Sequence, residues 1–379
     1  MTATSKPEQY GSDIETMEEV EEVLAISNDD FDAVIHTIRH EADTLFTWDY
    51  EQQRPALKKL YEKAKTSQWN GATDLDWSTE VDQEKVSWEM MSADNERLKL
   101  IADAPGSPFK GFSDANWVRV GVESQNWRLS QFMHGEQGAL ICTAQIVEDV
   151  PWIDAKYYAA TQVMDEARHV EVFARYLDEK LSGHYPINAH LRSLLDDIIT
   201  DSRWDMTYLG MQIMVEGLAL AAFGFMHMLT QEPLLKKLLR YVMADEARHV
   251  AFGVLSLKEA YEEMSSVELL ERQEFAYEAA LRMRNRFLQQ EMWERVGLDT
   301  KEVVHAILAV PPEEDVFTQM LFSKIVPNLK KLGLLDANDG WLRTKFADLG
   351  VIQFENWADT GEEYAALDEV AKDRAQESA

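Results

Sequence analysis

The chain has 379 residues, of which 46% are hydrophobic, and its formal net charge is −31. This length and composition allow a large buried core, arranged in one or two domains. The negative charge argues against nucleic acids and anionic membranes as partners, because both are polyanions. Cys142 is the single cysteine, which excludes an intrachain disulfide and an iron–sulfur cluster held by cysteines of one chain.

The sequence also gives no sign of a membrane anchor or a targeting peptide. The most apolar stretch, 206–230, contains Glu216 and His227, and no run of about 18 uncharged apolar residues occurs. The N-terminus is acidic and polar, unlike a signal or transit peptide. We therefore expect a cytoplasmic protein that does not bind membranes.

The N-terminal part is predicted to lead into a helical domain. Residues 1–28 are polar and are expected to be disordered, and one or two helices are expected in 31–46 and 55–65. A polar loop with two tryptophans, 68–82, follows. We predict a single helical domain over 29–365 and a polar tail over 366–379, because no Gly/Ser-rich or Pro-rich linker divides the chain.

The rest of the chain reads as long helices, since Leu, Ala, Met, Glu and Lys recur at helical spacing and few segments resemble strands. We predict four core helices, at about 117–148, 155–182, 190–230 and 234–263. Further helices are expected at 265–297 and within 311–335. The predicted fold class is therefore all-α, with a bundle core at about 115–263 and additional helices at both ends.

The hexapeptide DEARHV occurs twice, at 165–170 and 245–250. Each copy places a glutamate and a histidine three residues apart, so that both side chains lie on the same helix face. The pairs are Glu166 with His169 and Glu246 with His249. Paired Glu-x-x-His motifs, together with one glutamate from each of two other helices, are how four-helix bundles hold two metal ions.

The two additional glutamates are found at equal distances from the motifs. Glu136 lies 30 residues before Glu166, and Glu216 lies 30 residues before Glu246. A proline, Pro151 or Pro233, stands about halfway along each interval, which predicts two antiparallel helical hairpins. With about 1.5 Å of rise per residue, both members of each pair lie at the same depth. The six side chains would then form one layer of the bundle.

A single Glu-x-x-His motif is most often a solvated helix face. Here, however, Glu136 and Glu216 lie within apolar segments, where an unpaired buried carboxylate costs several kcal/mol. Metal coordination offsets that cost, so the sequence predicts a buried site for two metal ions.

With these motifs the chain resembles the ferritin-like di-iron carboxylate proteins, over roughly residues 115–260. The doubled D-E-x-R-H pattern is similar to the oxygen-activating branch. That branch includes hydroxylase subunits of multicomponent monooxygenases, ribonucleotide reductase small subunits, acyl-carrier-protein desaturases and arylamine N-oxygenases. The resemblance implies a ferritin-like four-helix bundle.

The resemblance also implies roles for individual residues. One iron would be bound by Glu136, Glu166 and His169, and the other by Glu216, Glu246 and His249. Glu166 and Glu246 would be the bridging carboxylates. Asp165 and Asp245 match aspartates that accept a hydrogen bond from a ligand histidine. Arg168 and Arg248 match arginines that pair with buried carboxylates, whereas the ordinary alternative is a salt bridge on the helix surface.

Three positions depart from known members of the branch. Phe173 stands where reductase small subunits carry a radical tyrosine, and Leu220 stands where multicomponent hydroxylases often have a threonine. The arylamine N-oxygenases have a further histidine ligand four residues before the position of Glu246, and this chain has Val242 there. The resemblance therefore implies six ligands and leaves the reaction type open.

Two functional classes follow. The first is a di-iron oxygenase that activates O2 to hydroxylate, N-oxygenate or desaturate a small organic or carrier-bound substrate. Such an enzyme would draw electrons from an external ferredoxin or flavin reductase and, by resemblance, act as a homodimer. The second is a non-oxygenase: an iron-oxidising or storage protein, a peroxide scavenger, or a Mn or Mn/Fe oxidase. Glutamate and histidine suit iron and manganese alike, so the ligands do not separate these classes.

Overall fold

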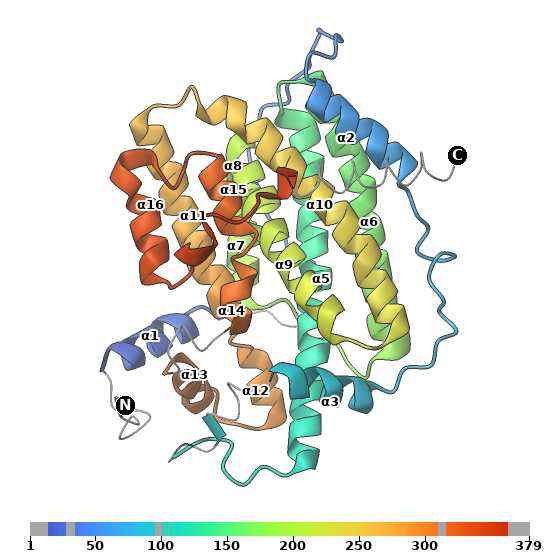
Figure 1. The fold of residues 1–379 in the computed structure, drawn as a ribbon, viewed down its shortest axis with the longest axis vertical. Helices are drawn as coiled ribbons and strands as arrows, with labels where there is room; N and C mark the ends of the chain where they lie inside the picture. The colour runs from blue at the N-terminus through green and yellow to red at the C-terminus, as the bar shows by residue number, and fades with distance from the viewer. Residues whose placement is uncertain are drawn as a thin grey trace.

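The computed structural model describes residues 14–27, 35–94, 101–309 except 103 and 105, and 316–362. Within these ranges all regular secondary structure is helical and no strand occurs. Figure 1 shows a bundle of long helices with shorter helices packed against one side and one end. The predicted all-α, ferritin-like fold is confirmed.

Two helical hairpins form the centre of the bundle. The first joins α5 (Asp114–Asp149) to α6 (Ile153–Lys180), and the second joins α9 (Glu216–Leu229) to α10 (Pro233–Tyr261). The turns lie at the two predicted breaks. The start of α10 is well defined, because Pro233 occupies its first turn and the Glu232 carboxylate accepts hydrogen bonds from the Leu234 and Leu235 amides.

The single helix predicted at 190–230 is wrong. The chain forms α7 (Ala189–Thr200), leaves the helical conformation near Asp201, and resumes with α8 (Trp204–Tyr208). Asp201 is extended, and its carboxylate accepts a hydrogen bond from the Arg203 amide and pairs with the Arg203 guanidinium at 2.7 Å. These local contacts compete with the helix, and the apolar pattern alone does not reveal them.

The helix that carries Glu216 contains a π-helical segment. Between α8 and α9 the chain forms η1 (Leu209–Val215), and Glu216 is the first residue after it. A π-turn inserts an extra residue into a helix and occurs mostly at functional sites. It also brings η1 close to α10, where a Cβ added at Gly253 would stand 2.6 Å from Gln212 Cβ.

The C-terminal half differs from the prediction in one further place. The helix predicted at 265–297 is divided into α11 (Ser266–Arg286) and α12 (Gln290–Val296), because Gln289 takes a left-handed conformation with φ 56°. The chain then forms α13 (Thr300–Leu308), α14 (Val316–Leu321), α15 (Ile325–Lys331), α16 (Ala337–Asp348) and η3 (Ile352–Phe354).

The N-terminal part is only partly as predicted. The helix expected at 55–65 is present as α2 (Pro55–Thr66), but the described residues of the expected helix at 31–46 are not helical. Disorder over 1–28 is wrong for α1 (Ile14–Ala25), whose Val20 and Val23 are buried against other helices. After the loop comes α3 (Gln83–Asp94). The predicted tail, 366–379, lies outside the described residues.

The hydrophobic core has two parts. The larger surrounds the four central helices and extends to α2, α7, α11, α15 and α16. The smaller joins α1, α12 and α13 to the first half of α5 and includes Trp127. Figure 1 shows these short helices at one end of the bundle. Among the described residues one helical run, Trp204–Leu229, is long and apolar enough to cross a membrane, but 83% of its most apolar window is buried inside the protein. It is a core helix of the bundle.

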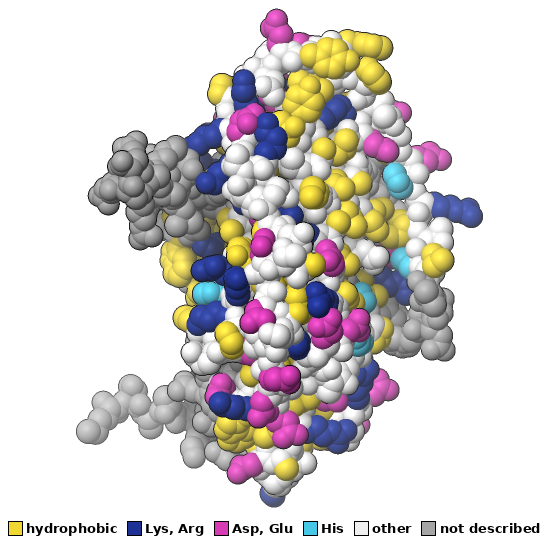
Figure 2. Space-filling view, turned by 90° about the vertical axis from the view of Figure 1, so that its right-hand side faces the viewer, with side chains coloured by type: hydrophobic (Ala, Val, Ile, Leu, Met, Phe, Trp, Pro, Cys, Tyr) yellow, Lys and Arg dark blue, Asp and Glu magenta, His cyan; other side chains and the backbone are white. Residues whose placement is uncertain are grey.

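The surface agrees with a solvated acidic protein. Figure 2 shows Asp and Glu side chains interspersed with Lys and Arg, without a single acidic patch on the described part of the face it presents. The net charge of −31 is therefore not evidence for one docking site on that face.

Replacing Gly253 with alanine is expected to lower the free energy of unfolding by about 1–3 kcal/mol, because the new Cβ meets Gln212 Cβ in a well-packed core. Gly224→Ala is the matched control. Its nearest atom is Met243 Cε at 3.7 Å, so it should stabilise the helix by about 0.5–1 kcal/mol. Urea unfolding of both variants measures the difference, and equal midpoints would contradict close packing of η1 on α10.

Candidate metal centre

The six predicted ligand residues lie together in the middle of the bundle. Two groups each bring four ligand atoms within 4.8 Å of one another. The first group is Glu136, Glu166, His169 and Glu246, and the second is Glu166, Glu216, Glu246 and His249. All six side chains are buried. Glu166 and Glu246 belong to both groups, as bridging carboxylates must, and we keep the predicted assignment of ligands as a proposal.

Both histidines present the same ring nitrogen to the carboxylates. His169 Nδ1 lies 3.0 Å from Glu246 Oε1 and 3.2 Å from Glu136 Oε2, and His249 Nδ1 lies 3.0 Å from Glu166 Oε1. The opposite nitrogens face aspartates. His169 Nε2 is 3.1 Å from Asp245, and His249 Nε2 is 3.4 Å from Asp165. Each aspartate therefore supports the histidine of the other motif and leaves its Nδ1 free to bind metal.

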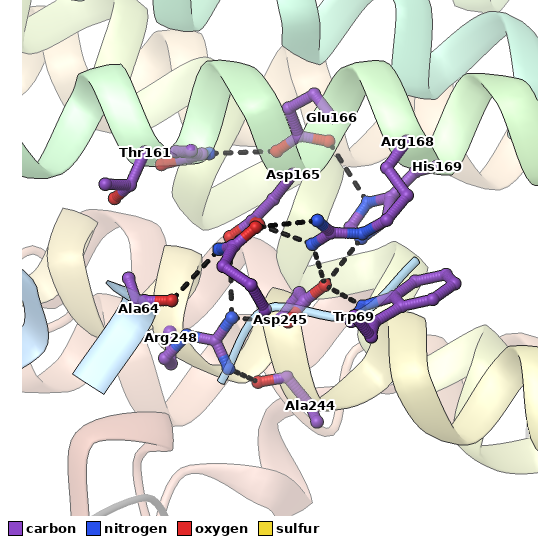
Figure 3. Close-up of polar contacts among 12 residues, drawn as sticks. Ala64, Trp69, Thr161, Asp165, Glu166, Arg168, His169, Ala244, Asp245 and Arg248 are labelled. Atoms are coloured by element: carbon purple, nitrogen blue, oxygen red, sulfur yellow. Dashed lines mark hydrogen bonds and ion pairs between the residues drawn. The ribbon is translucent and has the colours of Figure 1, made fainter. Parts of the chain in front are cut away.

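The two motif arginines join the aspartates into one buried layer. Arg168 Nη2 lies 2.5 Å from Asp165 and 2.9 Å from Asp245, and Arg248 Nη2 pairs with the same two carboxylates (Figure 3). Their side chains are only 6% and 3% exposed, which rules out the alternative of surface salt bridges. The layer ties α6 to α10 directly behind the two histidines.

Sequence reasoning missed two residues that complete this layer. Trp69 Nε1 donates a hydrogen bond of 2.7 Å to Asp245, and Gln68 Nε2 donates one of 3.0 Å to Asp165. The Arg168 guanidinium stacks 4.6 Å above the Trp69 ring (Figure 3). Both residues follow α2, in the loop that the sequence marked only as polar and rich in tryptophan. Their partners lie about a hundred residues or more away, so no local pattern identified them.

Gln162 was also missed, and it holds two of the carboxylates. Its Nε2 donates to Glu216 Oε1 at 2.8 Å and to Glu166 Oε1 at 3.1 Å. Gln162 stands four residues before Glu166, on the same helix face, and that spacing was the available signal. The corresponding residue before Glu246 is Val242, which is fully buried and offers no donor. The two halves of the site therefore differ on the carboxylate side.

The side chains fit a pair of divalent metal ions. Burial raises the pKa of Glu136 and Glu216 well above the usual range, and neighbouring glutamates raise it further. Carboxylate contacts outweigh burial and raise the pKa of both histidines. Glu216 Oε2 is buried and accepts no hydrogen bond, and the two buried oxygens of Glu246 meet the ligand histidines only as ion pairs at 3.0 and 3.5 Å. Such atoms are costly in a protein interior unless a cation binds them.

A small hollow opens beside the carboxylates. It has a volume of about 10 Å3 and is lined by Glu136, Glu216 and Glu246, by apolar and small residues, and by Arg286. Gly135, Ala139 and Ala219 are among the small residues that line this space. Gly138 instead permits close packing, since Leu195 Cδ2 stands 2.6 Å from the place of a Cβ.

A larger, mostly apolar cavity of about 690 Å3 lies on the opposite side, behind the histidines. Trp69, Asp245 and Arg248 form part of its wall, and Lys63, Arg240 and Lys324 also line it. Phe132 lines the small hollow and Leu220 the large cavity. Ile213 and Phe223 belong to the core.

The chain matches the family model described as p-aminobenzoate N-oxygenase AurF over residues 145–333. This range is just under half of the chain and includes five of the six proposed ligands, but not Glu136. Comparison with curated proteins finds no match.

Among solved structures, the chain is similar to R2-like ligand-binding oxidases. One, with an aerobically reconstituted metal cofactor after photoconversion, is 16% identical with a TM-score of 0.47, over 75% of this chain and 94% of that one. Another, with an aerobically reconstituted Mn/Fe cofactor, is 16% identical with a TM-score of 0.44, over 72% and 94%. These values are too low to assign a function.

The family match and the buried Glu/His cluster confirm the predicted resemblance to ferritin-like di-iron oxygenases. The chain is an oxidoreductase with a carboxylate-rich site for two metal ions.

Replacing Glu136 or His249 with alanine is expected to reduce the bound metal from two ions per chain to about one or fewer, because each change removes a ligand from one group. Glu171→Ala, which changes an exposed glutamate on α6, is the control and should retain both ions. Elemental analysis of the purified variants measures this. Two ions in His249→Ala would contradict the assignment.

Metal affinity is expected to rise with pH. In the metal-free protein Glu136, Glu216 and both histidines have raised pKa values, so they hold protons that a metal ion must displace. Release of one proton per ion makes the apparent affinity change about tenfold per pH unit. Titration with Mn²⁺ between pH 6 and 8, with proton release followed in weak buffer, tests this. An affinity independent of pH would contradict it.

Proposed function

We propose that this protein is a di-metal oxygenase that uses O2 to oxidise a small organic substrate. The observation that carries the proposal is the cluster of six buried metal-binding side chains, in which the Glu216 Oε2 atom beside a hollow accepts no hydrogen bond. A structural role would make no use of these costly groups. Two adjacent redox-active metal ions, iron or a Mn/Fe pair, would supply the electrons that activate O2.

The residues of this chain prepare the site in three ways. Asp165 and Asp245 fix the orientation of the ligand histidines. Gln162 holds the Glu216 carboxylate by a hydrogen bond at the edge of the hollow. Phe132, Val215 and Ala219 line the hollow with apolar surface, which keeps bulk water from the carboxylate side.

The type of oxidation is N-oxygenation, hydroxylation or desaturation, and N-oxygenation of an arylamine is the first to test. The family match supports it. Against it stands Val242, which replaces the additional histidine of the arylamine N-oxygenases, so the reaction has to proceed with six protein ligands.

We also propose an electron donor, an oligomeric state and a location for this protein. We propose that a separate ferredoxin or flavin reductase supplies electrons, since one cysteine cannot hold an iron–sulfur cluster within the chain. We propose a cytoplasmic homodimer that binds neither nucleic acid nor membranes.

Anaerobic protein loaded with two Fe²⁺ per chain is expected to consume O2 and, with a reductant, to oxidise 4-aminobenzoate or a member of a wider panel of amines and hydrocarbons. N-oxygenation and hydroxylation insert one oxygen atom from O2, whereas desaturation removes two hydrogens and leaves the oxygen in water. An oxygen electrode measures uptake, and mass spectrometry after labelling with ¹⁸O2 measures insertion. Glu171→Ala should behave as wild type, whereas His249→Ala should lose at least 90% of the product.

Continued oxidation of added Fe²⁺ without any organic product would contradict the oxygenase proposal and favour iron oxidation or storage. Activity restricted to manganese-loaded protein would likewise favour the second class.

A further inference from the structure

The charged side chains that line the large cavity are mostly cations, although the chain as a whole is strongly acidic. Lys63, Arg240, Arg248 and Lys324 line it, together with one carboxylate, that of Asp245. The whole chain has a formal net charge of −31. Arg248 and Asp245 pair with each other, so the excess of positive charge in the lining comes from the other three side chains. A cavity lined in this way attracts an anionic ligand.

The rest of the lining is mostly apolar, and much of it is aromatic. The cavity has a volume of about 690 Å3, which is within the range of about 300–1,000 Å3 found for ligand and cofactor sites. Tyr241 stacks on Trp69, with the ring centroids 4.9 Å apart and 15° between the ring planes. Phe225 and Trp357 add aromatic surface, and Trp357 is 50% exposed. Such a lining suits a ligand with a flat aromatic body.

The position of the cavity determines what a bound molecule can do. Asp245 is part of the cavity wall, and its carboxylate lies 3.1 Å from His169 Nε2. His169 Nδ1 faces the carboxylates on the other side of the ring. A molecule in the cavity is therefore separated from the proposed metal positions by one carboxylate and one imidazole. Its atoms cannot reach the hollow beside the glutamates, but electrons can cross two side chains that are in contact.

We propose that the large cavity binds reduced flavin mononucleotide, which supplies the electrons for the metal centre. This inference rests on the proposed function, which requires an external electron donor. The flavin ring system is planar and aromatic, and the phosphate carries nearly two negative charges at neutral pH, so the molecule matches both properties of the lining. A flavin reductase would be the class of enzyme that produces it.

The proposed step is a transfer of two electrons. Reduced flavin becomes oxidised flavin and releases two protons, and the two electrons return two trivalent metal ions to the divalent state. The flavin then leaves the cavity, and no atom of it has to pass the layer of aspartates and arginines behind the histidines.

Binding of oxidised flavin mononucleotide to the metal-loaded protein, followed by the quenching of flavin fluorescence, tests the site. Wild type is expected to bind it at least tenfold more tightly than riboflavin, which has the same ring system without the phosphate. The double substitution Arg240→Gln/Lys324→Gln should weaken binding of the nucleotide at least tenfold and leave riboflavin binding unchanged. Lys258→Gln, which changes an exposed lysine on α10 outside the cavity, is the matched control and should bind both flavins as wild type does.

Anaerobic stopped-flow spectroscopy tests the transfer. Reduced flavin mononucleotide, at a concentration that does not saturate the site, should reduce protein loaded with two Fe³⁺ per chain at least tenfold faster in wild type than in Arg240→Gln/Lys324→Gln. Reduced riboflavin should reduce both proteins at the same rate, because the substitutions remove only the contacts to the phosphate.

Equal binding of the nucleotide and riboflavin to wild type, or unchanged binding of the nucleotide in the double variant, would overturn the proposed site. Binding of dodecanoate but not of flavin would also overturn it and would assign the cavity to an aliphatic acid. Equal rates of reduction in wild type and the double variant would overturn the role of the bound flavin as electron donor.

The outcome is separable from that of the proposed function. A protein that binds flavin mononucleotide and is reduced by it, but oxidises no organic substrate, contradicts only the proposed function. A protein that oxidises a substrate with another reductant, but does not bind the nucleotide, contradicts only the present inference.

Discussion

The burial of six carboxylates, four from glutamates and two from aspartates, in the middle of an apolar bundle is the constraint on which the rest of the structure depends. An unpaired buried carboxylate costs several kcal/mol, so each one needs a cation or a donor nearby. Asp165 and Asp245 meet this need with Arg168 and Arg248, across the interface between α6 and α10. The histidines and Gln162 compensate the charge of the four glutamates only in part. The negative charge that remains is what makes the cluster a metal site.

The same constraint explains why distant segments close over the centre. Each aspartate accepts hydrogen bonds from an arginine, from a histidine and from the loop after α2. Removing one partner from such a network leaves a buried charge uncompensated, which typically costs about 3–5 kcal/mol. The loop at Gln68 and Trp69 is therefore part of the centre (Figure 3), and α2 is held against α6 and α10 for the same reason.

How far the sequence predicts this protein depends on whether a feature is local to one helical hairpin. Glu136 and Glu216 could be located by counting, because a hairpin with a central turn returns the chain to the same depth. The break at Asp201 and the left-handed Gln289 were not predicted, since single side-chain contacts and one backbone angle override an unbroken helical pattern. Trp69 and Arg286 depend on contacts across the whole fold, and no spacing in the sequence connects them to the motifs.

The two sides of the centre also differ in symmetry. Behind the histidines the DEARHV repeats produce matched contacts. Each aspartate contacts the histidine of the other motif, and each arginine pairs with the aspartate of the other motif. On the carboxylate side the two halves differ. The position of Gln162 in the first repeat corresponds to Val242 in the second, and a π-turn precedes Glu216 but not Glu136. Arg286 lines this side and has no counterpart in the other half. A symmetric half suits equal binding of two ions. The asymmetric half, which the repeat does not encode, gives the two proposed metal positions different surroundings.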